Sequence, residues 1–444
     1  MKKPSQIQYQ LKKDDILYFM HIPKTAGTTL VTIIDDHFDL DSICKAQLWV
    51  QILQNRHQDF AKCRLIRGHF GYGLHNILPK KPAYITMLRD PIERTISQYE
   101  HSRRSKFARL KDSSIIDTSF SHLINDPTAS PIFTNKQTRH LALDLDVLSL
   151  TAHMDKDSKD NFFYDSFMAF MSPDISDEKM LNIAKQHLSE FAFFGITERF
   201  EDSLSLMCYT FGWKPIPNII KQNVAPSRSA KEELAKETLD AITECTRLDT
   251  ELYQYACKIF DDRFSQMVQD LKERYTSDMS KQTVHELLEK NYQDRNDMKK
   301  TDSFELGFDK KISGNGWYPR EDYNNSGRIF RWTGPDNVST LDFAISNKKD
   351  LKIEFRVIMC LDSKILESLQ VRVNNNPIAI QVKSKEDGMT TFEGVIPHTI
   401  LQNKITELSF VVANTTSCHD VDKNNTDKRK LGLAIDHIKI HPVQ

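Results

Sequence analysis

The chain has 444 residues, of which 39% are hydrophobic and 27% are charged, a composition that is ordinary for a globular protein of about two or three domains. Its 60 basic and 61 acidic residues leave a formal charge of -1, so no overall field draws the protein to nucleic acid or to an anionic membrane. Any cationic binding site must therefore be local.

The sequence holds no apolar stretch that is typical of membrane targeting or insertion. Residues 1–14 are polar, and the apolar run at 16–20 is shorter than the core of a signal peptide. No segment approaches the roughly 20 apolar residues of a membrane helix. We therefore expect a cytoplasmic protein without a membrane span.

The 7 cysteines are scattered along the chain and include no C-x-x-C pair. This spacing favours reduced thiols over a disulfide framework or a zinc site.

Residues 15–36 predict a strand, a tight loop and a helix. The apolar run at 16–20 leads through the loop at 21–29 into a second apolar run. A helix N-terminus presents free N–H groups that favour phosphate or sulfate, and Lys24 adds a positive charge there. Gly27 allows close backbone approach, while Thr28 and Thr29 can cap the helix. The loop therefore predicts a phosphate cradle, with a plain strand-to-helix turn as the alternative.

This loop does not match the Walker A pattern of nucleotide-binding proteins. That pattern requires a glycine directly before the lysine, whereas here Lys24 precedes Gly27. Phosphate binding is therefore predicted without any implication of ATP.

Two further strand ends carry polar residues. Residues 64–70 read as a short strand that ends near His69, with neighbouring glycines that allow close approach of a ligand. Residues 83–88 read as a second strand, followed by Arg89 and by a helix whose first turn contains Pro91. Ligands of open α/β sheets bind at such strand ends, so we expect a site there.

The two loops resemble a known pair of motifs. Pro-Lys-Thr-x-Gly-Thr-Thr at 23–29 resembles the 5′-phosphosulfate loop of the sulfotransferase superfamily, and Arg-Asp-Pro-x-x-Arg-x-x-Ser-x-Tyr at 89–99 resembles its 3′-phosphate signature. The chain is thus identified as a member of that superfamily, whose donor is 3′-phosphoadenosine-5′-phosphosulfate (PAPS). Gly68-His69 more narrowly resembles heparan sulfate and chondroitin uronyl 2-O-sulfotransferases and their bacterial relatives. The resemblance covers about residues 14–264.

The resemblance implies transfer of a sulfuryl group from PAPS to a hydroxyl of a saccharide, without a metal. His69 would act as general base, and Lys24 would stabilise the leaving group. A loop at 223–228 would fold over the donor. The residues implied to bind the donor are Lys24, Thr25, Ala26, Gly27, Thr28, Thr29, Arg89, Ser97 and Arg228.

The sequence also allows other functions and other candidates for the base. One is a P-loop kinase or another nucleotide phosphotransferase, which would bind Mg-ATP. Another is a non-catalytic carbohydrate-binding protein, in which Lys24, His69 or Arg89 would be lost, yet all three are present. The reserve candidates for the base are His75, His101 and His140.

From residue 301 the pattern changes to short alternating strands separated by Asn, Gly and Asp turns. This pattern predicts a β-sandwich, and it resembles accessory modules of bacterial carbohydrate-active enzymes. Trp317 and Trp332 are candidates for stacking on sugar rings or for the core.

We therefore expect three parts. Residues 1–264 form a PAPS-dependent sulfotransferase domain of the α/β class, with a P-loop-like parallel sheet flanked by helices. Residues 265–300 form a helical connector. Residues 301–444 form an all-β sandwich that is a candidate carbohydrate-binding domain.

Overall fold

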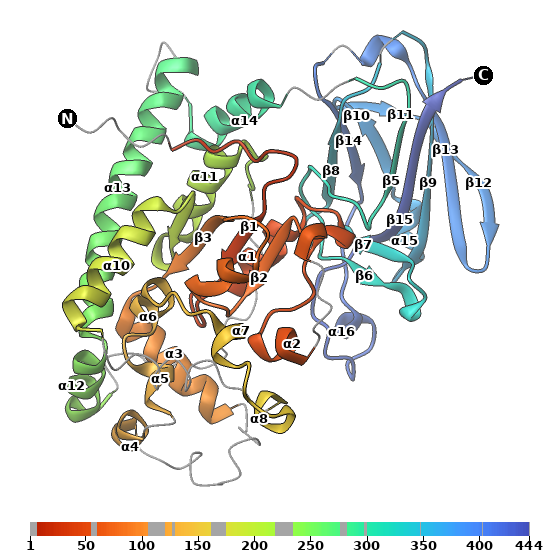
Figure 1. Cartoon of the computed structure of the whole chain (residues 1–444). Coiled ribbons are helices and arrows are strands. Elements are labelled where there is room, and N and C mark those ends of the chain that lie inside the picture. Colours follow the sequence, from red (N-terminus) through yellow and green to blue (C-terminus); the bar gives the residue numbers. More distant parts are fainter. Residues whose placement is uncertain are drawn as a thin grey trace. The chain divides into compact units, whose positions relative to one another are not determined.

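The computed structural model describes residues 7–54, 60–104, 120–126, 129–160, 175–217, 234–275, 282–296, 300–346, 348–401 and 403–443. The chain forms two compact units (Figure 1). The first unit comprises Met1–Val31, Ser42–Phe211 and Lys221–Leu287, and the second comprises Thr32–Asp41, Gly212–Ile220 and Leu288–Gln444.

A parallel four-stranded sheet lies at the centre of the first unit. Its order is β2 (Leu65–Gly68), β1 (Leu17–Met20), β3 (Ala83–Leu88) and β4 (Phe193–Ile196). Leu17 of the inner strand β1 pairs with Leu65 on one side and with Ala83 on the other. The strands are almost wholly buried, as expected of a parallel sheet covered on both faces. The predicted parallel sheet is confirmed.

A helix follows β1, β3 and β4, and the helices after β1 and β3 begin where the sequence predicts. α1 (Gly27–Asp35) follows β1, α3 (Pro91–Arg104) follows β3, and α11 (Phe200–Phe211) follows β4. The described residues between α1 and β2 form only short helices. The other helices described in this part of the chain are η1 (Leu40–Ser42), α2 (Trp49–Gln54), η2 (Phe60–Lys62), η3 (Tyr72–Ile77), α4 (Phe120–Asn125), α5 (Ser130–Phe133), α6 (Lys136–Ala142), α7 (Val147–Leu150), α8 (Lys156–Asp160), α10 (Asp177–Glu190), η5 (Thr197–Arg199) and α12 (Lys236–Cys245).

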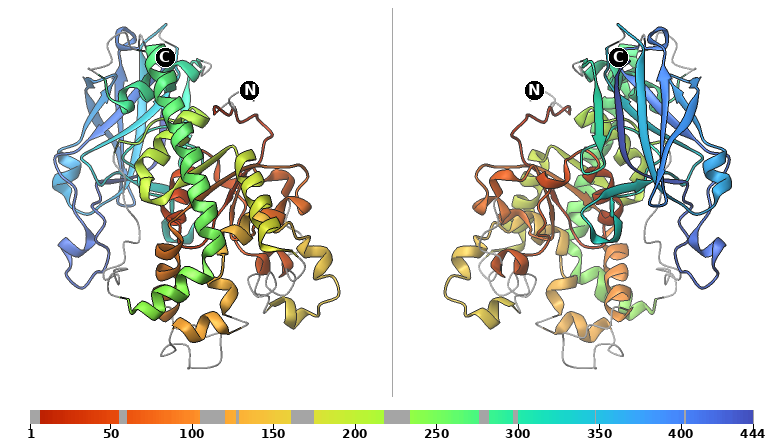
Figure 2. Two further views of the ribbon diagram at one scale, coloured as in Figure 1. Left: turned by 90° about the vertical axis from the view of Figure 1, so that its left-hand side faces the viewer. Right: turned by 90° about the vertical axis from the view of Figure 1, so that its right-hand side faces the viewer.

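The longest described helix continues past the predicted end of the catalytic domain. α13 runs over Arg247–Tyr275, and α14 (Val284–Arg295) follows it. Figure 2 shows α13 in green, beside α10. Within the described ranges, no helix combines the length and apolar character needed to span a bilayer.

Two antiparallel sheets make up most of the second unit. The first has the order β11 (Asn376–Ile378), β10 (Gln370–Val373), β14 (Thr406–Val411) and β8 (Val338–Phe343). The second has the order β12 (Ile380–Glu386), β13 (Met389–Ile396), β9 (Leu351–Cys360), β15 (Leu433–Pro442), β7 (Ile329–Trp332) and β6 (Glu321–Asp322), with β5 (Phe304–Gly307) paired to β15. Short helices connect them: η7 (Tyr323–Asn325), α15 (Ser363–Glu367), η8 (His398–Ile400) and α16 (Cys418–Val421).

One hydrophobic core joins these two sheets. Ile353 and Phe355 of β9 and Phe410 of β14 are buried in the same cluster, and alternate residues of β9 are buried as the strand period requires. Trp317 and Trp332 are 8% and 4% exposed, and the Trp317 indole donates to the Thr340 carbonyl at 2.8 Å. Both tryptophans therefore serve the core and offer no open face for a sugar ring.

A buried ion pair connects Lys214, in the described segment 212–217, to the β-sheet part of the second unit. The Lys214 ammonium lies 2.9 Å from the Asp342 carboxylate, whose side chain is 1% exposed. Burial raises the pKa of Asp342, and the Lys214 charge opposes that rise.

We expect Lys214→Met to lower the free energy of unfolding by about 3 kcal/mol, because removing one partner leaves a buried charge uncompensated. Urea denaturation of the full chain measures this change, with the exposed Lys349→Met as the control. A loss no larger than that of Lys349→Met would contradict the expectation.

Candidate active site

The loop after β1 has a strained backbone. Lys24 and Ala26 adopt φ values of 72° and 60°, in the left-handed region that side chains other than glycine seldom occupy. Gly27 is required here, because a Cβ at this position would lie 2.0 Å from the His21 Nε2. Such strain gathers at ligand-binding loops, where the surrounding structure maintains it. The loop thus packs tightly around the His21 ring.

His69 lies directly beyond β2 and against this loop. Its Nδ1 is 2.7 Å from the His21 carbonyl, and the two imidazole rings are 4.5 Å apart. A carbonyl oxygen only accepts, so the His69 Nδ1–H donates, and the neutral ring keeps its lone pair on Nε2. The main chain of the loop thus selects the tautomer of His69.

The surroundings of His69 keep its ring neutral. Burial, with a smaller contribution from the charge of Lys136, lowers the pKa of His69 to about 4, although the bond to His21 opposes the change. Burial also lowers the pKa of His140, and the charge of Lys136 lowers it as well. At pH 7 the His69 imidazole is therefore able to accept a proton.

Arg89 joins the two predicted motifs. Its Nη1 donates to the Lys24 carbonyl at 3.0 Å, so the residue after β3 contacts the loop after β1. Glu93 and Glu198 approach its guanidinium to 3.6 and 3.8 Å. The side chain is 12% exposed, so most of this cation is shielded from solvent.

Gln137, which the sequence analysis did not select, fixes the main chain of Arg89. Its amide nitrogen donates to the Arg89 carbonyl at 2.8 Å, and its amide oxygen accepts from the Arg89 N–H at 2.9 Å. Two hydrogen bonds to one residue leave its backbone little freedom to turn.

Asp249 of α13 holds the start of α6, where Gln137 lies. Its buried carboxylate accepts from the N–H groups of Gln137 and Thr138 at 3.1 and 2.7 Å. A carboxylate at a helix N-terminus satisfies backbone donors and complements the helix dipole. The segment 135–141 thus links α13 to Arg89.

The polar residues at the start of α3 differ in their contacts and in their exposure. Asp90 accepts from the Glu93 N–H at 2.9 Å and thereby caps the start of α3. Arg94 is fully buried and donates to the Ile132 carbonyl at 3.0 Å, so it supports the packing of α3. Ser97, one turn further on, is half-buried.

The other predicted site residues vary in exposure. Thr25 is buried and donates to the Ile22 carbonyl at 2.9 Å, Thr29 is buried, and Thr28 is exposed. Arg228 lies outside the described residues. Within the described ranges, no group of three or more His, Cys, Asp or Glu is arranged to hold a metal ion.

The reserve histidines have different surroundings. His75 of η3 lies 3.0 Å from the Tyr72 carbonyl and 3.6 Å from Asp144, and His101 of α3 is exposed. Of the three, His140 alone is buried beside His69.

Comparison with known proteins assigns the family of this chain. A family profile described as the sulfotransferase family matches residues 8–296. The chain belongs to the sulfotransferase family.

This sulfotransferase is similar to heparan-sulfate 6-O-sulfotransferase 1 of Cricetulus griseus, with 25% identity over 309 residues that cover 58% of this chain and 70% of the relative. It is 26% identical over 304 residues to heparan-sulfate 6-O-sulfotransferase 2 of Danio rerio, covering 58% of this chain and 60% of that relative. Among solved structures, a family 35 carbohydrate binding module from Clostridium thermocellum matches 32% of this chain and all of that module, with 8% identity and a TM-score of 0.21.

The predicted cytoplasmic location is wrong. These relatives are heparan-sulfate sulfotransferases, and they contradict it. The prediction relied on the polar start of the sequence, which does not fix where a protein works.

Proposed function

We propose that this sulfotransferase moves a sulfuryl group from PAPS to a hydroxyl of a saccharide, with His69 as general base. The observation that supports this most is the meeting of three strand-end features. The strained loop at 21–29 contacts Arg89 through the Lys24 carbonyl and His69 through the His21 carbonyl. A donor, a base and an acceptor must meet in this way for one transfer step.

The donor would bind between the end of β1 and the end of β3, in a P-loop-like cradle. Lys24 and the N–H groups of Thr25, Ala26, Gly27, Thr28 and Thr29 would hold the 5′-phosphosulfate, since a helix N-terminus favours an anion. Arg89 and Ser97 would hold the 3′-phosphate, with Arg228 as a further contact. ATP lacks a 3′-phosphate and would leave Arg89 without that partner, so this arrangement favours PAPS.

His69 would activate the acceptor. Its Nε2 would take the hydroxyl proton while the acceptor oxygen forms a bond to sulfur and the bond from sulfur to the phosphate oxygen breaks. The products are a sulfate ester and adenosine 3′,5′-diphosphate. Lys24 would stabilise the negative charge that develops on the leaving oxygen.

The saccharide acceptor is inferred from the relatives, which are named for heparan sulfate. Incubating the full chain with radiolabelled PAPS and a glycan library tests this proposal. We expect label in one class of glycan and none in tyrosine peptides or lipids. Labelling of peptides alone would exclude a saccharide acceptor, and hydrolysis of Mg-ATP without use of PAPS would favour a phosphotransferase.

Adenosine 3′,5′-diphosphate should raise the melting temperature, and Arg89→Ala should remove most of this rise, because a contact between arginine and phosphate is charge-assisted. Calorimetry measures both. Equal stabilisation by 5′-AMP would contradict the 3′-phosphate role.

The domain limits 1–264, 265–300 and 301–444 stay a prediction. If they are right, adenosine 3′,5′-diphosphate should shift the thermal unfolding transition of residues 1–264 and leave a second transition, that of the β-sandwich, unchanged.

Gln137→Leu should weaken binding of adenosine 3′,5′-diphosphate about tenfold, because the Arg89 main chain loses two hydrogen bonds and its side chain is no longer held at the phosphate. Binding of 5′-AMP should change less than threefold. Calorimetric titration of both nucleotides separates this positional effect from general damage, which would weaken both alike. Gln51→Leu, at an amide that bonds main-chain N–H groups elsewhere in the first unit, is the control.

A further inference from the structure

A cavity of about 270 Å³ opens where β3 and β4 begin, among residues that include Ala83 and Phe193. We name it the β3–β4 cavity. Parallel strands all begin at one edge of a sheet and end at the opposite edge. The loop at 21–29, His69 and Arg89 all follow strand ends, whereas the cavity lies where two strands begin. The length of β3, at about 3.3 Å per residue, places the cavity roughly 20 Å from Arg89. It is therefore separate from the transfer site.

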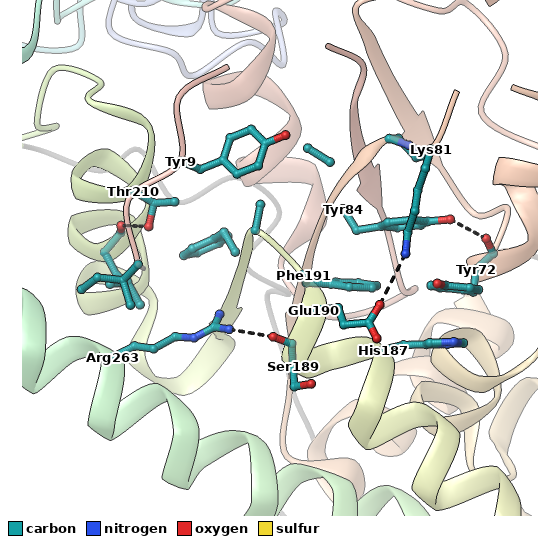
Figure 3. Close-up of a pocket in the computed structure, with 16 residues that line it drawn as sticks. Tyr9, Tyr72, Lys81, Tyr84, His187, Ser189, Glu190, Phe191, Thr210 and Arg263 are labelled. Atoms are coloured by element: carbon teal, nitrogen blue, oxygen red, sulfur yellow. Dashed lines mark hydrogen bonds and ion pairs between the residues drawn. The ribbon is translucent and has the colours of Figure 1, made fainter. Parts of the chain in front are cut away.

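The β3–β4 cavity has an apolar floor that is already formed. Pro82, Phe191 and Leu206 line it and are buried. The rings of Tyr84 and Phe191 stack at 4.8 Å, and the Tyr84 hydroxyl donates to the Tyr72 carbonyl at 2.8 Å (Figure 3). Contacts on several sides hold these rings in place, so the floor needs no rearrangement to receive an apolar group.

The carboxylate at the rim of the cavity already has partners. Glu190 lies 3.4 Å from the Lys81 ammonium and accepts from the Gln186 amide at 3.3 Å. Figure 3 shows Lys81 extending toward Glu190, while Arg263 approaches from α13. The negative charge of Glu190 is thus balanced by Lys81.

Arg263 lacks a comparable partner. Its Nη2 donates to the Ser189 carbonyl at 3.3 Å, and its guanidinium lies 4.9 Å from the centre of the Phe194 ring. Its Nε is buried without an acceptor, and no carboxylate pairs with Arg263, in the part of the chain that the structure describes. Burial lowers the pKa of Arg263. A partly buried guanidinium of this kind gains more from an anion than a fully exposed one does.

We propose that the β3–β4 cavity binds a small monocarboxylate with an aromatic or aliphatic body. The carboxylate pairs with the Arg263 guanidinium, and the body lies on the floor formed by Pro82, Phe191 and Leu206. A small inorganic anion is disfavoured because it has no apolar body to lie on this floor. A sugar acid is disfavoured because its hydroxyl groups would lie against the apolar side chains of Pro82, Phe191 and Leu206.

Calorimetric titration of the full chain with phenylacetate and with its neutral analogue phenylacetamide tests the ligand class. We expect saturable binding of phenylacetate, and binding of the amide at least tenfold weaker, because only the carboxylate pairs with the guanidinium. Equal binding of acid and amide would overturn the proposal. So would tighter binding of glucuronate or inorganic sulfate, or no saturable binding of phenylacetate.

Variants on α13 locate the site. Arg263→Met, which keeps an unbranched apolar side chain, should weaken phenylacetate at least tenfold, whereas the exposed Arg274→Met should leave it unchanged. Binding of adenosine 3′,5′-diphosphate should persist in both variants, which shows that the first unit is folded. If Arg263→Met binds phenylacetate as wild type does, the proposal fails. If that variant does not fold, the comparison of acid with amide in wild-type protein still decides.

Discussion

His69→Ala should lower turnover by roughly 10²- to 10⁴-fold, the usual contribution of a positioned general base. Donor affinity should stay within a few-fold of wild type, because a base acts in the transition state and adds little to ground-state binding. Label incorporation from PAPS measures the first quantity, and calorimetric titration of adenosine 3′,5′-diphosphate measures the second on the same sample.

His75→Ala is the matched control for this experiment. His75 is also half-buried and bonded to a main-chain carbonyl, but this carbonyl belongs to Tyr72 of η3 and not to the loop at 21–29. Its loss should change turnover less than threefold. Activity of His69→Ala within a few-fold of wild type would remove His69 from the mechanism, and His140 would be tested next.

The pH dependence of the same reaction follows from the lowered pKa of His69. A lowered pKa means that the imidazole stays neutral, and able to accept a proton, down to about pH 4. The kcat/KM profile reports the free enzyme, so its acidic limb should fall near pH 4 and not near 6.5. A limb at pH 6.5 in the wild type would show that the base is exposed to solvent.

The strands and strand ends could be predicted because local pattern determines them. The apolar runs at 16–20 and 83–88 contain β1 and β3, since a parallel strand buried on both faces must be apolar along its length. Polar residues directly after such runs lie at one sheet edge, and this rule selected His69 and Arg89. The same rule would have selected His21, which directly follows β1.

The residues that hold the site in shape could not be found in this way. Gln137 is 48 residues from Arg89 in the sequence, and Asp249 is 112 residues from Gln137. Pairs so far apart leave no periodic signal, because only the packing of α6 and α13 brings them together. A weak signal was present in the polar run at 135–140, which directly precedes apolar Leu141.

In the second unit, the sequence could not decide whether Trp317 and Trp332 face the core or the solvent, and the reason is different. In an alternating strand, an aromatic residue on one face looks the same whether that face meets the core or the solvent. Trp332 has the same spacing from Phe330 in either case, and only the packing of the strands shows that both are buried. Sequence alternation predicts a strand, but not which face is covered.

Lys24→Ala should lower kcat by roughly 10²- to 10³-fold, the usual cost of removing one group that stabilises transition-state charge. Alanine is suitable here because Lys24 has a φ of 72°, and alanine is as disfavoured there as lysine, so the substitution removes the charge without relaxing the loop. Ground-state donor affinity should fall much less than kcat, because charge on the leaving oxygen develops as its bond to sulfur breaks.

The exposed Lys13→Ala is the control for a lost positive charge near the same strand. Single-turnover measurement with saturating PAPS isolates the chemical step from product release. If Lys24 contributed only to donor binding, the substitution would raise KM and leave the single-turnover rate unchanged, and its role in the transition state would be excluded. A loss of rate in Lys24→Ala with donor affinity retained would instead place the lysine charge at the leaving oxygen, while Arg89 anchors the opposite end of the donor.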